Sequence, residues 1–184
     1  MDMYKADFLK KKKIKIEYLY LDLNTCKRCV KTNDNLNLAI KDICNILGKE
    51  GYEVELSKIK IDSIYLAEKY EFLTSPTIRV NEIDVMEILL ETNCSECGEI
   101  CGNNEISCRS WKHEEEILDV PTVEMIVHKM LKVIKEKDRK IEKGIYVMPD
   151  NLKKFFSGKD KINKIKNMKS LKIKRKIISI DANK

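Results

Sequence analysis

The sequence predicts an α/β fold with a four-stranded mixed sheet and helices on both of its faces. Two observations support this prediction. Two strand-like segments, 14–23 and 52–61, flank a segment with helical periodicity, 26–48, and a hairpin pattern follows around residues 81–82. A strand–helix–strand unit crosses over right-handed, so its two strands are expected to lie parallel. Of the 184 residues, 43% are hydrophobic, which is enough for a buried core.

Each element follows from a local pattern. Residues 14–23 read IKIEYLYLDL, and this run of Ile, Leu and Tyr is typical of a buried strand. The following segment spaces its apolar residues by three and four, as on one face of a helix. Gly48 or Gly51 can end that helix. Its apolar face is predicted to consist of Leu36, Ala39, Ile40, Ile43, Cys44 and Leu47.

The second strand, 52–61, alternates apolar and polar residues, and Asp62 or Ser63 can cap a short helix that ends near Leu73. Two short β segments then flank the polar turn at residues 81–82, which predicts a hairpin. A last amphipathic helix is expected from Pro121 to about residue 137. The predicted order is β-α-β-α-β-β-α.

The domain organisation follows from a change of composition along the chain. We expect one domain over residues 1–138, interrupted at 91–118 by a cysteine-rich inserted loop before the last helix. Residues 139–184 form a basic, partly helical or disordered extension. Residues 151–184 hold 12 basic and two acidic residues, whereas positions 1–150 hold 24 basic and 28 acidic ones. Specific nucleic-acid binding is not expected, because Lys is abundant along the whole chain.

Several classes of protein are excluded by missing patterns. No run of about 18 apolar residues could span a membrane, and the N-terminal segment lacks the pattern of a secretory signal. We therefore expect a cytoplasmic protein. The chain has no glycine-rich phosphate loop, no nucleophile elbow and no HExxH motif.

The cysteines carry the functional information. An odd number, seven, in a chain expected to be cytoplasmic favours redox chemistry or metal binding over a disulfide framework. Cys26 and Cys29 lie where the first strand ends and the first helix begins. The helix N-terminus, with Lys27 and Arg28, would stabilise a thiolate on an exposed Cys26, and Cys29 would be the more buried resolving thiol.

This arrangement resembles the thioredoxin/glutaredoxin superfamily over residues 13–137, and is similar to its cysteine-rich members. The resemblance rests on Cys26 and Cys29, on the helix 62–73 and on Ser75-Pro76-Thr77. It implies a thioredoxin-like fold in which Cys26 is catalytic, Cys29 resolves a mixed disulfide and Pro76 is a site residue with cis geometry. It also implies a protein or small-molecule disulfide or dithiol substrate and an electron donor.

A second group of thiols lies in the predicted loop, at Cys94, Cys97, Cys101 and Cys108. In the resembled fold this loop leaves the sheet at the edge where Cys26 lies. One hypothesis is a thiol–disulfide oxidoreductase in which these residues are auxiliary thiols that exchange with Cys26 and Cys29. The alternative is a protein that binds or delivers zinc, copper or an arsenic-type metalloid through these four cysteines, with Cys26 and Cys29 as extra ligands or a release switch. No cofactor other than such a metal is expected.

Overall fold

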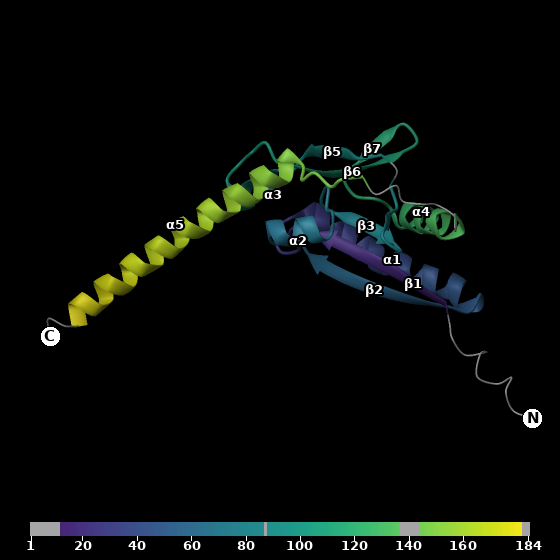
Figure 1. Cartoon of the computed structure of the whole chain (residues 1–184), viewed down its shortest axis with the longest axis horizontal. Helices are drawn as coiled ribbons and strands as arrows, with labels where there is room; N and C mark the ends of the chain where they lie inside the picture. The colour runs from purple at the N-terminus through teal and green to yellow at the C-terminus, as the bar shows by residue number, and fades with distance from the viewer. Residues whose placement is uncertain (1–11, 87, 137–143, 182–184) are drawn as a thin grey trace, which may run out of the picture.

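The computed structural model describes residues 12–86, 88–136 and 144–181, and the side chains as far as residue 171. Strands and helices alternate from residue 12 to residue 80, and a long helix comes last among the described elements (Figure 1). In chain order the elements are β1 (Lys12–Tyr20), α1 (Lys27–Lys49), β2 (Tyr52–Lys60), α2 (Ile64–Lys69), β3 (Thr77–Val80), β4 (Ile83–Asp84), β5 (Leu90–Asn93), α3 (Ser95–Cys101), β6 (Ser107–His113), β7 (Glu116–Leu118), α4 (Val123–Lys135) and α5 (Asp150–Asp181).

The central sheet has four strands in the order β2-β1-β3-β4. β1 and β2 are parallel, with Ile16 opposite Leu56, whereas β3 runs antiparallel to both β1 and β4. The predicted α/β fold with a mixed four-stranded sheet is therefore confirmed, as is the hairpin turn at residues 81–82. This strand order is compatible with the thioredoxin-like fold that the sequence suggested.

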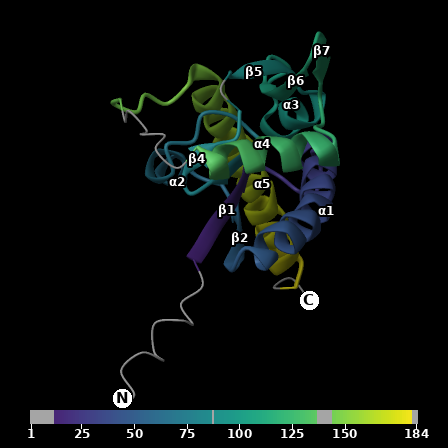
Figure 2. The ribbon, with the colours of Figure 1, turned by 90° about the vertical axis from the view of Figure 1, so that its right-hand side faces the viewer.

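One face of the sheet is covered by α1 and α4, which pack against each other (Figure 2). Alternate residues of β1 point toward these helices and are buried, whereas Lys13 and Lys15 between them are exposed. The burial of apolar side chains from both helices against this face supplies most of the core. The β1 residues that face the helices are Ile14, Ile16 and Tyr18.

A second buried cluster lies at the carboxyl end of β1 and includes the opposite face of that strand. Leu19 of β1 packs there with Ala67 of α2 and with Phe72, which follows that helix. Successive strand residues point to opposite faces, so α2 covers the face that α1 and α4 leave open. The sheet thus has helices on both faces. Cysteines from α1, α3 and β6 belong to this second cluster.

The segment predicted to be an inserted loop is instead regular structure. Residues 91–118 contain a three-stranded antiparallel sheet, β5-β6-β7, and helix α3 between β5 and β6. Strand β6 buries four consecutive residues, Cys108 to Trp111, rather than every second one. This burial on both faces removes the alternation by which a strand is recognised in a sequence. We call residues 91–118 the insertion.

Helix α5 docks only through its first turns and then projects from the body (Figure 1). Leu152, Phe155 and Phe156 are buried in the second cluster, beside the cysteines. Gly158 brings the helix against the insertion, because a Cβ at this position would lie 2.2 Å from the carbonyl oxygen of Cys101. The residues of α5 beyond Ile162 whose side chains are described are exposed.

Cys44 was expected in the core, but it is exposed, since only one side of α1 faces the sheet and Ile43 and Leu47 occupy it. In the ranges that the structure covers, no helix combines the length and apolar character that crossing a membrane requires.

Candidate metal centre

Four cysteine sulfur atoms meet at the carboxyl end of β1. The Sγ atoms of Cys26, Cys94, Cys97 and Cys108 all lie within 4.8 Å of one another, and all four residues are buried. The Sγ of Cys26 is 3.9 Å from that of Cys94, and the Sγ of Cys108 is 3.3 Å from that of Cys97. We call these residues the four-cysteine site. It joins one sulfur atom from the N-terminus of α1 to three from the insertion.

The turn before α1 places Cys26. In this turn, the Oδ1 atom of Asp22 accepts hydrogen bonds from three backbone N–H groups, those of Asn24, Thr25 and Cys26. Such a turn fixes the chain where it leaves β1. Cys26 is the N-cap residue of α1, so its side chain lies at the positive end of the helix.

The other three sulfur atoms come from one end of the β5–β6 pair, where β5 ends and β6 begins. Cys108 lies on β6 opposite Thr92 of β5. The chain then passes from β5 into α3, where Cys94 is the N-cap residue and Cys97 lies in the first turn. The N–H of Cys94 donates to the carbonyl of Ile106 at 2.8 Å, which joins the start of α3 to the residue before β6. The spacing Cys94-x-x-Cys97 at a helix N-terminus brings both sulfur atoms to one side.

A buried arginine fastens the insertion to α1. The Arg28 side chain, 7% exposed, donates to the backbone carbonyls of Cys108 at 2.9 Å and Asn93 at 3.2 Å. It also reaches the carbonyls of Thr92 and Arg109 at 3.4 and 3.3 Å. Its guanidinium lies 2.7 Å from a carboxylate oxygen of Asp119. Arg28 therefore positions the strands that carry Cys94 and Cys108, a role that its place between two cysteines did not reveal.

Cys29 lies beside the four-cysteine site but outside it. Its Sγ is 3.3 Å from the Oγ of Ser75, and that oxygen also accepts the N–H of Leu21 at 3.0 Å. The peptide bond between Ser75 and Pro76 is cis, the geometry that the resemblance implies. The carbonyl of Ser75 accepts the N–H of Arg109 at 2.7 Å, so the proline loop also contacts β6.

The remaining residues singled out in the sequence lie apart from these sulfur atoms. Cys101 is buried at the end of α3, and its thiol donates to the backbone carbonyl of Gly98 at 3.6 Å. Although Cys101 lies on the same side of the helix as Cys97, four residues of rise carry it about 6 Å further along the axis. Lys27 is exposed.

The structure also corrects the expected exposure of Cys26. The sequence predicted an exposed nucleophile, whereas the Cys26 side chain is 0% exposed. The reason is that the insertion and the first turns of α5 pack over the end of β1, together with Cys26. A buried thiol meets substrates only after this cover opens.

The close sulfur atoms perturb one another's protonation. Hydrogen bonds from the thiols of Cys108, Cys29, Cys94 and Cys97 lower the pKa of Cys26. The neighbouring thiols raise the pKa of Cys97, and hydrogen bonding to Cys26 raises that of Cys108. The thiols around Cys26 thus favour its thiolate form.

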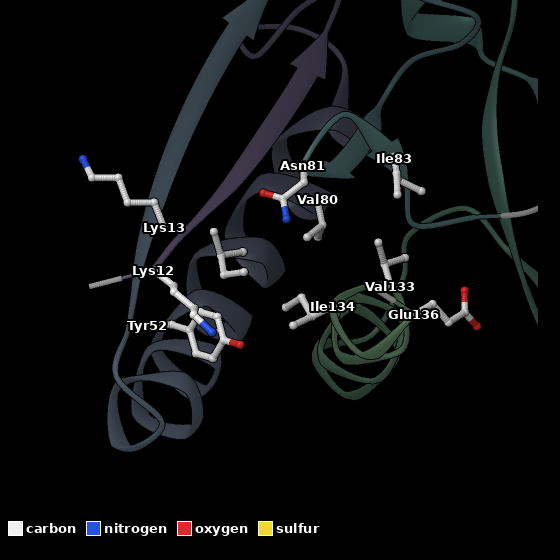
Figure 3. A pocket seen from close by; sticks show the side chains of 10 residues that line it. Lys12, Lys13, Tyr52, Val80, Asn81, Ile83, Val133, Ile134 and Glu136 are labelled. Atoms are coloured by element: carbon white, nitrogen blue, oxygen red, sulfur yellow. The ribbon is translucent and has the colours of Figure 1, made fainter. Parts of the chain in front are cut away.

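A separate pocket of about 350 Å³ lies at the opposite end of β1. Lys12 and Tyr52 line it from the starts of β1 and β2, and Val80 and Ile134 line it from β3 and α4 (Figure 3). Cys26 follows the other end of β1. This pocket is therefore not part of the four-cysteine site.

Comparison with known proteins gives one family. Residues 14–129, more than half of the chain, match the family described as Domain of unknown function (DUF2703). The chain belongs to this family. No curated protein and no solved structure matches the chain.

The DUF2703 match has a clear relation to the site. It spans Cys26, Cys94, Cys97 and Cys108, and it also contains Arg28. It ends within α4, so α5, whose first turns pack beside the cysteines, lies outside the matched residues. The DUF2703 region of this chain thus contains every member of the four-cysteine site.

Proposed function

We propose that this protein binds one thiophilic divalent metal ion, zinc in the first place, through Cys26, Cys94, Cys97 and Cys108. The observation that carries the proposal is the approach of these four sulfur atoms to within 4.8 Å of one another in a buried location. Their convergence from sequence positions far apart distinguishes this group from a local pair of cysteines.

The spacing of the sulfur atoms suits tetrahedral coordination. Zinc–sulfur bonds of about 2.3 Å place the corners of a tetrahedron about 3.8 Å apart. Two of the sulfur pairs of the site are separated by 3.9 and 3.3 Å, and every other pair by no more than 4.8 Å. Small movements of side chains would therefore complete the tetrahedron without a change of fold.

The donor set also selects among metals. Four thiolates in tetrahedral geometry are typical of zinc and of iron–sulfur centres, whereas carboxylate and carbonyl oxygens suit magnesium and calcium. Four protein ligands leave no open position, which is typical of a structural zinc site rather than a catalytic one. The bound ion would link α1 to the insertion.

Metal analysis of anaerobically purified protein tests this proposal. We expect one zinc per chain, and after replacement by Co²⁺ we expect the visible absorption of tetrahedral cobalt–thiolate coordination. If the protein contains stoichiometric iron instead of zinc, the same four cysteines are the ligands and the bound metal is iron. Titration with Cu⁺ and with trivalent arsenic identifies any softer preferred ion. Protein that neither contains nor binds a metal would contradict the proposal.

Cysteine variants give the sharper test. Cys26→Ser should lose the metal, because it removes one of the four sulfur donors. Cys101→Ser should keep it, although the sequence pattern grouped Cys101 with the four main ligands and gave Cys26 only as an extra ligand or part of a release switch. Cys44→Ser is the matched control for an exposed thiol. Retention by Cys26→Ser together with loss by Cys101→Ser would refute the assignment.

A second candidate function is a thiol–disulfide oxidoreductase on a thioredoxin-like scaffold. It is favoured by the strand order β2-β1-β3-β4, by Cys26 at the N-terminus of α1 and by the cis bond before Pro76. The complete burial of Cys26 makes this the weaker candidate. Turnover of a disulfide substrate by metal-free protein, lost in Cys26→Ser, would favour it.

A further inference from the structure

Cys26 can form either of two kinds of bond. It belongs to the four-cysteine site, and it is also the first cysteine of the Cys26-Lys27-Arg28-Cys29 sequence. As the N-cap residue of α1, Cys26 faces the third residue of the helix, which is Cys29. Both residues are buried in the same cluster. Cys29 is thus next to a metal ligand without being one of the four.

The surroundings of Cys29 hold it in this position. Its Sγ contacts the Oγ of Ser75 at 3.3 Å, and its backbone carbonyl accepts a hydrogen bond of 2.6 Å from the hydroxyl of Tyr18. Cys29 and Tyr18 are both 0% exposed. By contrast, the contacts described for the Cys101 sulfur are with backbone carbonyl oxygens, not with another side chain.

We propose that Cys29 places the metal centre under redox control: oxidation joins Cys26 to Cys29 and thereby releases the metal. This inference rests on the proposed metal binding. A sulfur atom in a disulfide is no longer a thiolate donor, so the site would retain only Cys94, Cys97 and Cys108. The two states of Cys26, metal ligand and disulfide partner, exclude each other.

The oxidant that suits this buried pair is a peroxide, because a small molecule needs a smaller opening of the cover over Cys26 than a protein disulfide does. The Cys26 thiolate attacks one peroxide oxygen, the O–O bond breaks, and the departing hydroxide takes up a proton to become water. The Cys29 thiol then attacks the sulfenic sulfur of Cys26. The S–S bond forms, the S–O bond breaks, and the departing hydroxide takes the Cys29 proton and leaves as a second water.

The electrons balance in this sequence. The two cysteines together lose two electrons, and hydrogen peroxide gains two as it becomes two molecules of water. The metal leaves as a divalent ion with its oxidation state unchanged. A dithiol reductant reverses the reaction by exchange with the Cys26–Cys29 disulfide, after which the four-cysteine site can bind metal again.

The test uses the zinc-loaded, full-length protein. Hydrogen peroxide is added, released zinc is followed with a chromogenic chelator, and the disulfides formed are mapped by mass spectrometry. Wild-type protein should release its zinc as the Cys26–Cys29 disulfide forms. A dithiol reductant should then restore zinc binding to the wild type and to Cys101→Ser, the control for another buried thiol outside the site. Cys29→Ser cannot form the disulfide, so its Cys26 sulfenic acid is oxidised further and its zinc binding should not recover.

Three outcomes would count against the inference in distinguishable ways. Recovery of zinc binding by Cys29→Ser equal to that of the wild type would overturn it and leave metal binding intact. A wild-type disulfide between Cys97 and Cys108, with Cys29 still reduced, would overturn it even if the Cys29 variant fails to fold. Absence of zinc before peroxide is added would contradict the proposed function itself, and the redox control with it.

Discussion

The guanidinium of Arg28 lies 2.7 Å from the carboxylate of Asp119, and the same guanidinium donates to the backbone carbonyl of Cys108. Asp119 follows β7, so this contact joins the beginning of α1 to the far end of the insertion. The Asp119 side chain is 64% exposed, whereas that of Arg28 is 7% exposed. The arginine is therefore held mainly by the carbonyl groups that it satisfies within the protein.

Replacing this arginine should separate the insertion from α1. We expect Arg28→Met to lower the free energy of unfolding by about 3 kcal/mol, because several buried carbonyl groups lose a charged donor. Zinc affinity should fall as well, since Cys94 and Cys108 are no longer positioned against Cys26. Denaturant unfolding and chelator competition measure the two effects. Lys27→Met, at the neighbouring exposed position, is the control, and equal effects of both variants would argue against the positioning role.

Gly158 provides a test in which two effects oppose each other. In an ordinary helix interior, Gly→Ala stabilises by about 1 kcal/mol. At position 158 the new Cβ would meet the Cys101 carbonyl oxygen at 2.2 Å, and such overpacking costs about 1 to 3 kcal/mol. We expect Gly158→Ala to destabilise the protein, whereas Ser157→Ala, one position earlier on the exposed side, should not. Stabilisation by both substitutions would mean that α5 does not dock as described.

Ser75 connects the proline loop with Cys29 and β1. Ser75→Ala removes the hydroxyl that contacts the Cys29 thiol and accepts the N–H of Leu21. We expect a loss of about 1 to 2 kcal/mol in unfolding free energy, because a buried N–H is left without this acceptor. Ser57→Ala on the exposed part of β2 is the matched control. A Ser75 variant as stable as this control would show that water replaces the hydroxyl.

The raised pKa values of Cys97 and Cys108 predict a pH dependence of metal binding. Both thiols hold their protons more tightly than an ordinary cysteine, and both must lose them to bind metal. Acidification therefore opposes binding, and zinc affinity should rise by roughly tenfold per pH unit for each proton released between roughly pH 6 and 8. Chelator competition across this range, with proton release measured in weak buffer, provides the test. An affinity independent of pH would contradict the prediction.

The main sheet could be predicted because its elements have clear periods. The spacing of Leu36, Ala39, Ile43 and Leu47 identified the buried side of α1, and all four residues are buried. The turn at Asn81 and Glu82 predicted the β3–β4 hairpin. In the insertion, by contrast, short strands and continuous burial from Cys108 to Trp111 left no period to detect.

The sequence predicted where the four-cysteine site lies, but not which cysteines form it. Strand direction indicated that the insertion leaves the sheet near Cys26, and the structure places Cys94, Cys97 and Cys108 there. Which sulfur atoms approach one another depends on distances of a few ångströms along α3. These distances separate Cys97 from Cys101, although both fit the same cysteine spacing.

Because the ribosome makes the chain from its N-terminus, the docked part of α5 is synthesised after all four cysteines of the site. Synthesis proceeds at about 5 to 20 residues per second, so the 48 residues from Cys108 to Phe156 take roughly 2 to 10 seconds. During that interval on the ribosome all four cysteines have been translated, while the phenylalanines that will pack beside them have not. The nascent chain thus passes through a stage in which the sulfur atoms lack their final helical cover.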